Sequence, residues 1–206
     1  MDCRQHWEQV YATKASTAVS WFQEHAELSM RLIHATGVSK DAPMIDVGGG
    51  ASTLVDDLLS DGYSNVTVLD LSAKALGVAK QRLGVRADSV NWVEGDVTKL
   101  SLPVHAYDIW HDRAVFHFLT DPNDRHAYVQ QVMRSVRPGG HVIVATFAED
   151  GPEKCSGLPA VRYRPDSLHA EFGSAFQLLK HEKEVHNTPF GTEQKFVYCY
   201  CRLENS

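Results

Sequence analysis

The chain has 206 residues, of which 43% are hydrophobic and 22% are charged, and its formal net charge is −6 at pH 7. This length fits one domain of ordinary size, and the composition excludes a disordered, collagenous or coiled-coil chain. The negative balance gives no general attraction to a nucleic-acid backbone, so nucleic acid is not expected as a partner.

No apolar run reaches the ~20 residues that a bilayer span needs, and residues 1–11 lack the apolar stretch of a signal peptide. The four cysteines are too few and too scattered for a disulfide framework; they are Cys3, Cys155, Cys199 and Cys201. We therefore expect a cytoplasmic protein with reduced thiols and no membrane partner.

Along the chain, short β-rich segments alternate with helical patterns. Strands are predicted at 43–47, 65–70, 90–96, 107–112 and 141–147. The helices between them carry apolar residues on one face, as at 54–59. Ser72 is expected to cap the second of these helices, and the Arg-Pro-Gly-Gly segment at 137–140 to end the last one.

Strands separated by helices of this length predict right-handed crossovers and a parallel sheet covered on both faces. The pattern changes after a loop at 148–165 and a short helix near 166–173. Two longer strand-like runs follow, at 176–186 and 194–203, with a turn-like segment between them. The predicted fold is α/β: a Rossmann-like, doubly wound, mostly parallel seven-stranded sheet with a C-terminal antiparallel hairpin.

Chemistry is expected beyond the carboxyl ends of the parallel strands, where doubly wound sheets bind ligands. The first such turn contains Asp46, Gly48, Gly49 and Gly50, and glycines let a backbone approach a ligand closely. Asp70 ends the second strand, and a carboxylate there is placed to accept hydrogen bonds from ribose hydroxyls. Together these residues indicate a cofactor that contains adenosine.

The glycine spacing distinguishes two kinds of adenosine cofactor. A dinucleotide site favours G-x-G-x-x-G, but the third glycine position here is Thr53. An acid two residues before G-x-G is typical of S-adenosylmethionine (SAM) sites. Asp46, Gly48 and Gly50 fit that pattern, although Ser52 replaces the usual third glycine.

Further segments extend this likeness: Gly95-Asp96-Val97 after the third strand, 108–113 at the fourth, 137–140 and the terminal hairpin. From about His6 to Arg202, the order of elements resembles the class I SAM-dependent methyltransferases, as a small bacterial-type member with one domain. The resemblance implies an enzyme of class EC 2.1.1 that transfers a methyl group from SAM by in-line displacement and releases S-adenosylhomocysteine (SAH).

The resemblance also implies which residues hold the cofactor. Asp46 and the glycine turn would line its methionine part, Asp70 would hold the ribose, and Asp96 would read the adenine edge. The full expected set is Asp46, Gly48, Gly49, Gly50, Ser52, Asp70, Leu71, Asp96, Val97, Asp112, Trp21 and Tyr11.

Residues 1–40 resemble the helical lid of several bacterial methyltransferases and of some protein-lysine methyltransferases, with 41–206 as the α/β core of the same domain. Aromatic residues of this lid would close over cofactor and substrate, although they also fit the buried face of an ordinary helix. Substrate contacts are expected from Trp7, Phe22, Arg113, Phe116 and Arg162.

An acceptor that must lose a proton needs a general base, and the candidates are Asp112, His117 and His111. Their alternative roles are a helix cap for Asp112 and structural roles for the two histidines. An acceptor that is already anionic would need none of them.

The sequence favours a small acceptor, such as a thiol, amine, metalloid or chalcogen compound, because we find no segment for a recognition domain. The alternative acceptor is a protein lysine, favoured by the lid and by 188–191 but not by 112–119. A non-catalytic module that binds an adenosyl cofactor is the alternative of another class. No cluster has metal-ligand spacing, and a metalloid site of Cys155, Cys199 and Cys201 is a weaker possibility.

Overall fold

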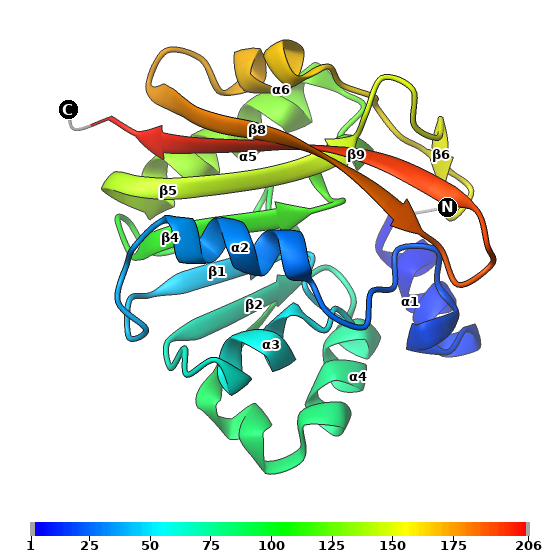
Figure 1. The fold of residues 1–206 in the computed structure, drawn as a ribbon. Helices are drawn as coiled ribbons and strands as arrows, with labels where there is room; N and C mark the ends of the chain where they lie inside the picture. Colours follow the sequence, from blue (N-terminus) through cyan, green and yellow to red (C-terminus); the bar gives the residue numbers. More distant parts are fainter. Residues whose placement is uncertain (1–2, 205–206) are drawn as a thin grey trace.

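A computed structural model describes residues 3–204. Seven strands form one sheet in the order β3-β2-β1-β4-β5-β9-β8 (Figure 1). The parallel strands are β1 (Met44–Val47), β2 (Val66–Asp70), β3 (Val90–Glu94), β4 (Tyr107–Arg113) and β5 (Val136–Phe147). The antiparallel hairpin consists of β8 (Phe176–Asn187) and β9 (Glu193–Leu203). The predicted α/β fold is confirmed.

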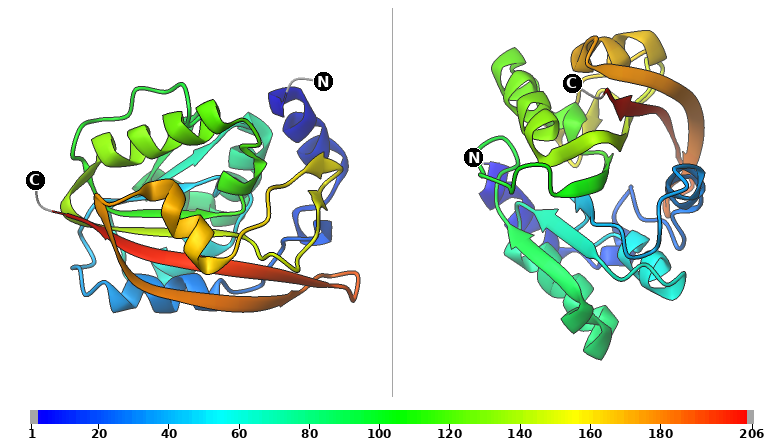
Figure 2. Two further views of the ribbon diagram at one scale, coloured as in Figure 1. Left: turned by 90° about the horizontal axis from the view of Figure 1, so that it is seen from above. Right: turned by 90° about the vertical axis from the view of Figure 1, so that its left-hand side faces the viewer.

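Helices cover both faces of the sheet (Figure 2). One face carries α2 (Glu27–Ala35), α3 (Leu54–Ser60) and α4 (Ala73–Leu83), and the other carries α5 (Pro122–Ser135) and α6 (Pro165–Phe172). Successive strand residues point to opposite faces of the sheet. Ile109 therefore packs in the core on the side of α2, α3 and α4, and Trp110 packs in the core on the side of α5 and α6. Both side chains are completely buried.

Local signals explain where the helices begin. The hydroxyl of Ser72 accepts a hydrogen bond from the backbone N–H of Ala75 at 3.1 Å, as expected of the cap of α4. Asp121 caps α5 through the N–H of Asn123, and Pro122 occupies the first turn.

The segment 137–140 does not separate helix from strand as predicted. Helix α5 ends at Ser135 and β5 starts at Val136, so the Arg-Pro-Gly-Gly segment lies inside the strand. The pairing of β4 with β5 shifts register between the Tyr107 and Ile109 pairs, and this irregularity accommodates the proline and glycines. The strand therefore begins five residues before the predicted His141.

The N-terminal part divides differently from the prediction. Helix α1 (Cys3–Thr13) and the 3-10 turn η1 (Ser16–Ala18) lie beside α4 at the carboxyl ends of the strands (Figure 1). Helix α2 instead packs on the sheet, where Leu32 and Ile33 are buried. Within the predicted lid, the residues that line the cavities at the carboxyl ends of the strands fall in 3–25, or in 26–29 at the start of α2, and we call 3–25 the lid segment by its position; the apolar face of α2 belongs to the core.

Smaller elements complete the structure. The 3-10 turns η2 (Gly84–Ser89) and η3 (Phe116–Phe118) follow α4 and β4, respectively. The predicted loop at 148–165 contains a short antiparallel pair, β6 (Lys154–Cys155) and β7 (Leu158–Pro159), which the sequence did not indicate. Within the described residues, no helix combines the length and apolar character needed to cross a membrane.

Candidate cofactor and acceptor site

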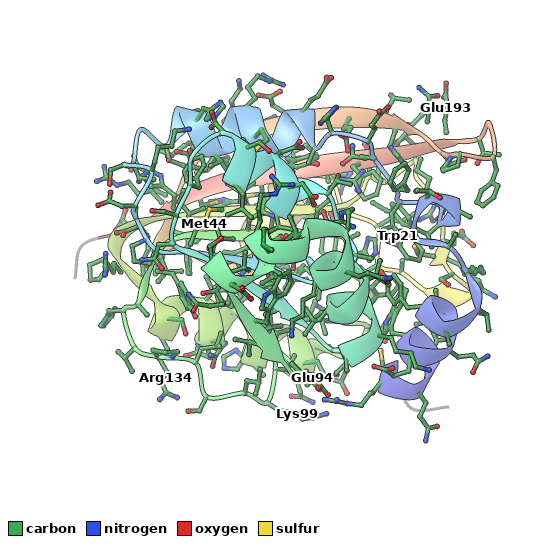
Figure 3. All side chains as sticks on the ribbon, turned by 90° about the horizontal axis from the view of Figure 1, so that it is seen from below. Trp21, Met44, Glu94, Lys99, Arg134 and Glu193 are labelled. Atoms are coloured by element: carbon green, nitrogen blue, oxygen red, sulfur yellow. The ribbon has the colours of Figure 1, made fainter. Side chains whose placement is uncertain are left out.

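Two cavities lie at the carboxyl ends of the parallel strands. The larger has a volume of about 500 Å³ and crosses the ends of β3, β2, β1 and β4. The smaller, of about 40 Å³, lies behind the glycine turn. Trp21 contributes to both cavities, and Figure 3 shows it on the opposite side of the molecule from Met44, where β1 begins.

The glycine turn is packed too closely for side chains. A Cβ on Gly49 would lie 2.1 Å from Oδ2 of Asp46, and one on Gly50 would lie 2.4 Å from Oδ2 of Asp70. Gly48 has a φ of +72°, which favours glycine. The turn therefore brings its backbone directly against two carboxylates.

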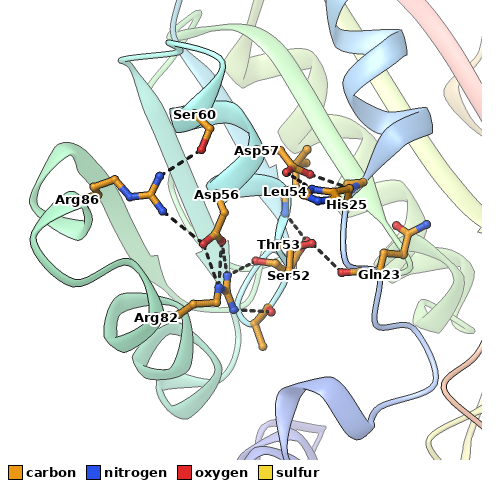
Figure 4. Close-up of polar contacts among 12 residues, drawn as sticks. Gln23, His25, Ser52, Thr53, Leu54, Asp56, Asp57, Ser60, Arg82 and Arg86 are labelled. Carbon is orange, nitrogen blue, oxygen red and sulfur yellow. Dashed lines mark hydrogen bonds and ion pairs between the residues drawn. The ribbon is translucent and has the colours of Figure 1, made fainter.

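Arg82 of α4 fixes the end of this turn (Figure 4). Its guanidinium donates to the carbonyl oxygens of Ala51 at 3.1 Å and Ser52 at 2.6 Å, and forms an ion pair with Asp56 of α3. The hydroxyl of Thr53 donates to the carbonyl of Gln23, so the turn is also tied to the lid segment.

Asp70 lines the larger cavity with its neighbour Leu71. Its carboxylate accepts the backbone N–H of Gly50 at 3.0 Å and of Ser72 at 2.8 Å. Burial raises its pKa to about 6 against the effect of these hydrogen bonds. The group is therefore largely ionised at neutral pH and can accept hydrogen bonds from ribose hydroxyls.

Asp96 and Val97 line the same cavity at the end of β3. Burial favours a higher pKa for Asp96, but hydrogen bonds from Lys99 and Thr98 outweigh it and hold the pKa below its usual value. The Oδ1 atom accepts from the backbone N–H of Thr98 at 3.0 Å and from its hydroxyl at 2.7 Å. This end of the cavity presents a fixed, ionised carboxylate.

Asp46 and His111 line the smaller cavity and are 2% exposed. The Nδ1 atom of His111 lies 2.7 Å from Oδ1 of Asp46, and its Nε2 atom lies 2.9 Å from the hydroxyl of Ser29. The other carboxylate oxygen of Asp46, Oδ2, has no hydrogen-bond partner among the described residues. Both ring nitrogens are engaged, so His111 is not placed to take a proton from an acceptor.

The expectation that Asp112 faces cofactor or acceptor is corrected by the structure. Asp112 is completely buried and lines neither cavity. It accepts the backbone N–H groups of Val115 and Phe116, and the hydroxyl of Tyr128 donates to it at 2.6 Å. In β4 the side chain of Asp112 lies on the face opposite to those of His111 and Arg113, so it holds the loop after β4 instead.

The expected roles of His117 and Phe116 are corrected for the same reason, since both side chains are fully buried away from the cavities. The Nδ1 atom of His117 accepts the backbone N–H of Phe147, and burial lowers the pKa of the ring to about 3. It is therefore neutral and structural. Phe116 packs between Tyr128 and Phe172.

Four aromatic rings form one wall of the larger cavity, and we call them the aromatic wall: Trp7, Tyr11, Trp21 and Phe118. Trp7 lies edge-on to Trp21 at 5.5 Å and to Phe118 at 5.2 Å, between ring centres. Three of these rings were predicted to line the site, but Phe118 was not. Phe22 lines the smaller cavity instead.

Arg113 lies between the two cavities and is held by the C-terminal hairpin. Its guanidinium forms an ion pair with Glu184 at 3.0 Å, donates to the hydroxyl of Tyr198 at 3.0 Å and lies over the ring of Phe196. It also donates to the carbonyl of Trp21 in the lid segment. No local pattern indicates that residues so distant in the chain meet at Arg113.

Arg162 does not join the site. It is exposed, forms an ion pair with Glu153 at 3.1 Å and lines neither cavity, so its expected contact with substrate has no support in this arrangement.

The three cysteines considered for a metalloid site are separated by the sheet. Cys155 lines the larger cavity and packs in the core cluster of Tyr198. Cys199 and Cys201 point to the opposite face of β9 and pack in the other cluster. No group of three metal-ligating side chains is found in 3–204.

These features fit an adenosyl cofactor. The larger cavity offers one carboxylate at β2 and another at β3, Asp46 of the smaller cavity has an unpartnered carboxylate oxygen among the described residues, and the glycine turn brings its backbone close to Asp46 and Asp70.

Comparison with known proteins leads to the same family. Residues 45–144 match the family described as "Methyltransferase domain". The chain is 25% identical over 139 residues to the mouse eEF1A lysine and N-terminal methyltransferase, covering 67% of this chain and 19% of that protein. It is 28% identical over 109 residues to the ubiquinone/menaquinone biosynthesis C-methyltransferase of Roseobacter denitrificans, covering 52% and 42%. The chain thus spans less than half of either relative.

A solved structure from work on conversion of a disulfide bond into a thioacetal group in echinomycin biosynthesis has the same fold. The TM-score is 0.79 at 16% identity, with 98% of this chain and 91% of that chain covered. The match over residues 45–144 places this part of the chain among the class I SAM-dependent methyltransferases, for which SAM is the methyl donor, and the solved structure shows that their fold extends over the rest of the described chain.

Proposed function

We propose that this chain transfers the methyl group of SAM to a small acceptor by in-line displacement and releases SAH. One observation carries the proposal: a single cavity of about 500 Å³ extends from the carboxylates of Asp70 and Asp96 to the aromatic wall. It has room for an adenosyl group at one end and a flat acceptor at the other. Bound SAM supplies a methyl group that is already activated as a sulfonium.

The residues of the chain align the reactants and exclude water. Asp70 and Asp96 hold the adenosine end, and the aromatic wall covers the end near β4. Alignment of this kind contributes as much as ~7–11 kcal/mol in favourable cases. We propose no covalent intermediate on the protein.

The acceptor end of the cavity favours a substrate that brings its own nucleophilic lone pair. Burial raises the pKa of Tyr11 above its usual value and that of Cys155 to about 11, so both remain protonated at neutral pH. Arg113 is an ion-paired cation. None of these three side chains is thus suited to remove a proton.

The charge of the acceptor end also bears on substrate choice. The cation of Arg113 is balanced by Glu184, so it offers little net attraction to an anionic substrate. The four rings favour a planar or apolar molecule. We therefore infer a heteroaromatic nitrogen, a soft thiolate or a similar chalcogen compound as the acceptor class.

A protein lysine is the second candidate acceptor. The mouse relative carries lysine methyltransferase in its name, and an aromatic wall also attracts a lysine ammonium group. A lysine must lose a proton before it can accept the methyl group, and the residues of the aromatic wall supply no base for this step.

The test has two steps. Calorimetric titration with SAM, SAH and NAD should show binding of the two adenosyl ligands only, and binding of NAD alone would overturn the proposal. A screen with radiolabelled SAM against heteroaromatic amines, thiols, chalcogen compounds and a protein lysate then identifies the acceptor. Label transferred only to protein would favour the lysine alternative.

An acceptor that loses its proton without help from the protein predicts a specific pH dependence of kcat/KM. If no protein group acts as a base, kcat/KM for a series of thiols should rise with pH along the pKa of each thiol. A rise at one fixed pH for all thiols would instead reveal a protein base.

A further inference from the structure

The smaller cavity contains a buried carboxylate that is satisfied on one side only. Asp46 is 2% exposed, and its Oδ1 atom is paired with His111 while its Oδ2 atom has no partner among the described residues. An ionised oxygen in this state is costly unless a donor reaches it. A ligand that supplies a donor there, above all a cation, would remove this cost.

The backbone of the glycine turn lies close against Oδ2. Gly49 has no side chain, and a Cβ at that position would lie 2.1 Å from Oδ2. Arg113 also lines this cavity, but its guanidinium is already paired with Glu184 at 3.0 Å. The described residues that line this cavity therefore leave the buried Oδ2 atom without a donor.

The orientation of the carboxylate is fixed from behind. An ionised Asp46 only accepts hydrogen bonds, so Nδ1–H of His111 donates to it at 2.7 Å. In a neutral ring the Nε2 atom then accepts from the hydroxyl of Ser29, 2.9 Å away on α2. Ser29 is 1% exposed, so water does not compete for this contact.

We propose that His111, held by Ser29, is a positioning residue that presents Oδ2 of Asp46 to the α-ammonium group of the amino-acid part of SAM and SAH. This inference rests on the proposed function, because it assumes that an adenosyl cofactor binds here. The sequence predicted that His111 acts as a general base, whereas here we propose that it orients Asp46.

The experiment compares two ligands that differ in the amino-acid part. SAH contains the ammonium group, whereas 5′-deoxy-5′-methylthioadenosine lacks the whole amino-acid part. We expect His111→Leu to weaken the binding of SAH by about 10- to 100-fold and to change the affinity for methylthioadenosine by less than about twofold. His111→Asn should recover most of the SAH affinity, since its amide N–H can occupy the place of Nδ1–H.

A milder variant guards against misfolding. Ser29→Ala should weaken the binding of SAH by about threefold and leave the affinity for methylthioadenosine unchanged, as expected for loss of one neutral hydrogen bond. Ser135→Ala is the matched control, because Ser135 is equally buried, on α5, and lines neither cavity. Ser135→Ala should leave the affinity for both ligands unchanged.

The outcomes separate the two proposals. Equal weakening of both ligands in His111→Leu and Ser29→Ala would show a general structural role and overturn the inference. Unchanged SAH binding in both variants would overturn it as well. Failure of the unaltered protein to bind either adenosyl ligand would instead overturn the proposed function.

Discussion

At the scale of single residues, two buried carboxylates with similar environments have different tasks. Asp70 and Asp112 both have a pKa raised to about 6 by burial. Asp70 lines the larger cavity, whereas Asp112 is closed off by Val115, Phe116 and Tyr128. The raised pKa of both carboxyl groups thus indicates only that they are buried. A carboxylate that can contact a ligand is distinguished from a structural one by whether it lines a cavity.

Asp70 should contribute directly to cofactor affinity. Asp70→Asn replaces an acceptor-only carboxylate by an amide, and we expect SAH to bind about 10- to 100-fold more weakly, as for loss of charged hydrogen bonds. Calorimetry measures the change. Asp88→Asn, at an exposed position of η2, is the control and should bind SAH normally. Normal affinity in Asp70→Asn would remove Asp70 from the site.

The titration of Asp112 predicts a pH dependence of stability. Its pKa is raised in the folded state, so the folded protein holds the proton more tightly than the unfolded chain. This stabilising contribution is complete below about pH 4 and is lost as the pH rises through about 6. The free energy of unfolding of the wild type minus that of Asp112→Asn should therefore fall over this range in urea titrations. A constant difference would contradict the assignment.

The sequence was sufficient to place the glycine turn and the acids at the ends of β1, β2 and β3 at one edge of the sheet, because their spacing follows from the strand–turn–helix pattern. It was misleading for Asp112 and His117. Asp112 lies in β4 and His117 in the turn after it, and which face a side chain takes depends on how β4 is placed against its neighbours. Phe118 was missed because one aromatic residue in a turn carries no pattern.

At the scale of elements, the loop after β4 depends on α5. The hydroxyl of Tyr128 accepts from Nε1 of Trp110 at 2.9 Å and donates to Asp112 at 2.6 Å. Tyr128→Phe leaves two buried groups without this partner and should lower the free energy of unfolding by about 1–3 kcal/mol. Urea denaturation measures the loss, and an unchanged midpoint would show that these bonds contribute nothing.

The C-terminal hairpin holds the lid segment. Glu184 pairs with Arg113 through Oε2 and accepts from the amide of Gln23 through Oε1 at 2.9 Å. Glu184→Gln should loosen this contact and increase acrylamide quenching of tryptophan fluorescence, because Trp21 lies next to Gln23. Glu182→Gln, on the same strand but paired with Arg31 and Lys180, is the control and should quench as the wild type does.

The hairpin itself was predictable from two strand-like runs, but its contact with the lid was not. The polar run of β8 gives no sign that Glu184 is only 13% exposed. That burial follows from the pairing of β8 with β9, which sets Glu184 opposite Phe196, and from the position of Arg113 on β4. Contacts of this kind depend on three distant segments and have no local signal.

At the scale of the whole molecule, ligand binding should stabilise the fold. A ligand that binds only the folded state at 100 times its Kd adds about 2.7 kcal/mol, which raises the Tm of a chain of this size by about 5–10 °C. We expect this rise with SAH and none with NAD in thermal denaturation. A rise with NAD alone would contradict the cofactor assignment.

The architecture was the most predictable feature, because alternating strands and helices leave few topologies open. Seven strands, their directions and the terminal hairpin agree with the prediction. The extent of the lid was not predictable, since α2 has the amphipathic pattern of any surface helix and only its contacts assign it to the core.

The insertion of β9 between β5 and β8 has a consequence for biosynthesis. Residues 193–203 must leave the ribosome before β5 acquires its second neighbour. Until then the nascent chain exposes an unpaired strand edge, and Arg113 lacks both Glu184 and Tyr198. Arg113, which lines both cavities, is thus held in place only by segments that are translated late, so stalled or shortened products would retain most of the sheet but lack the partners that fix this side chain.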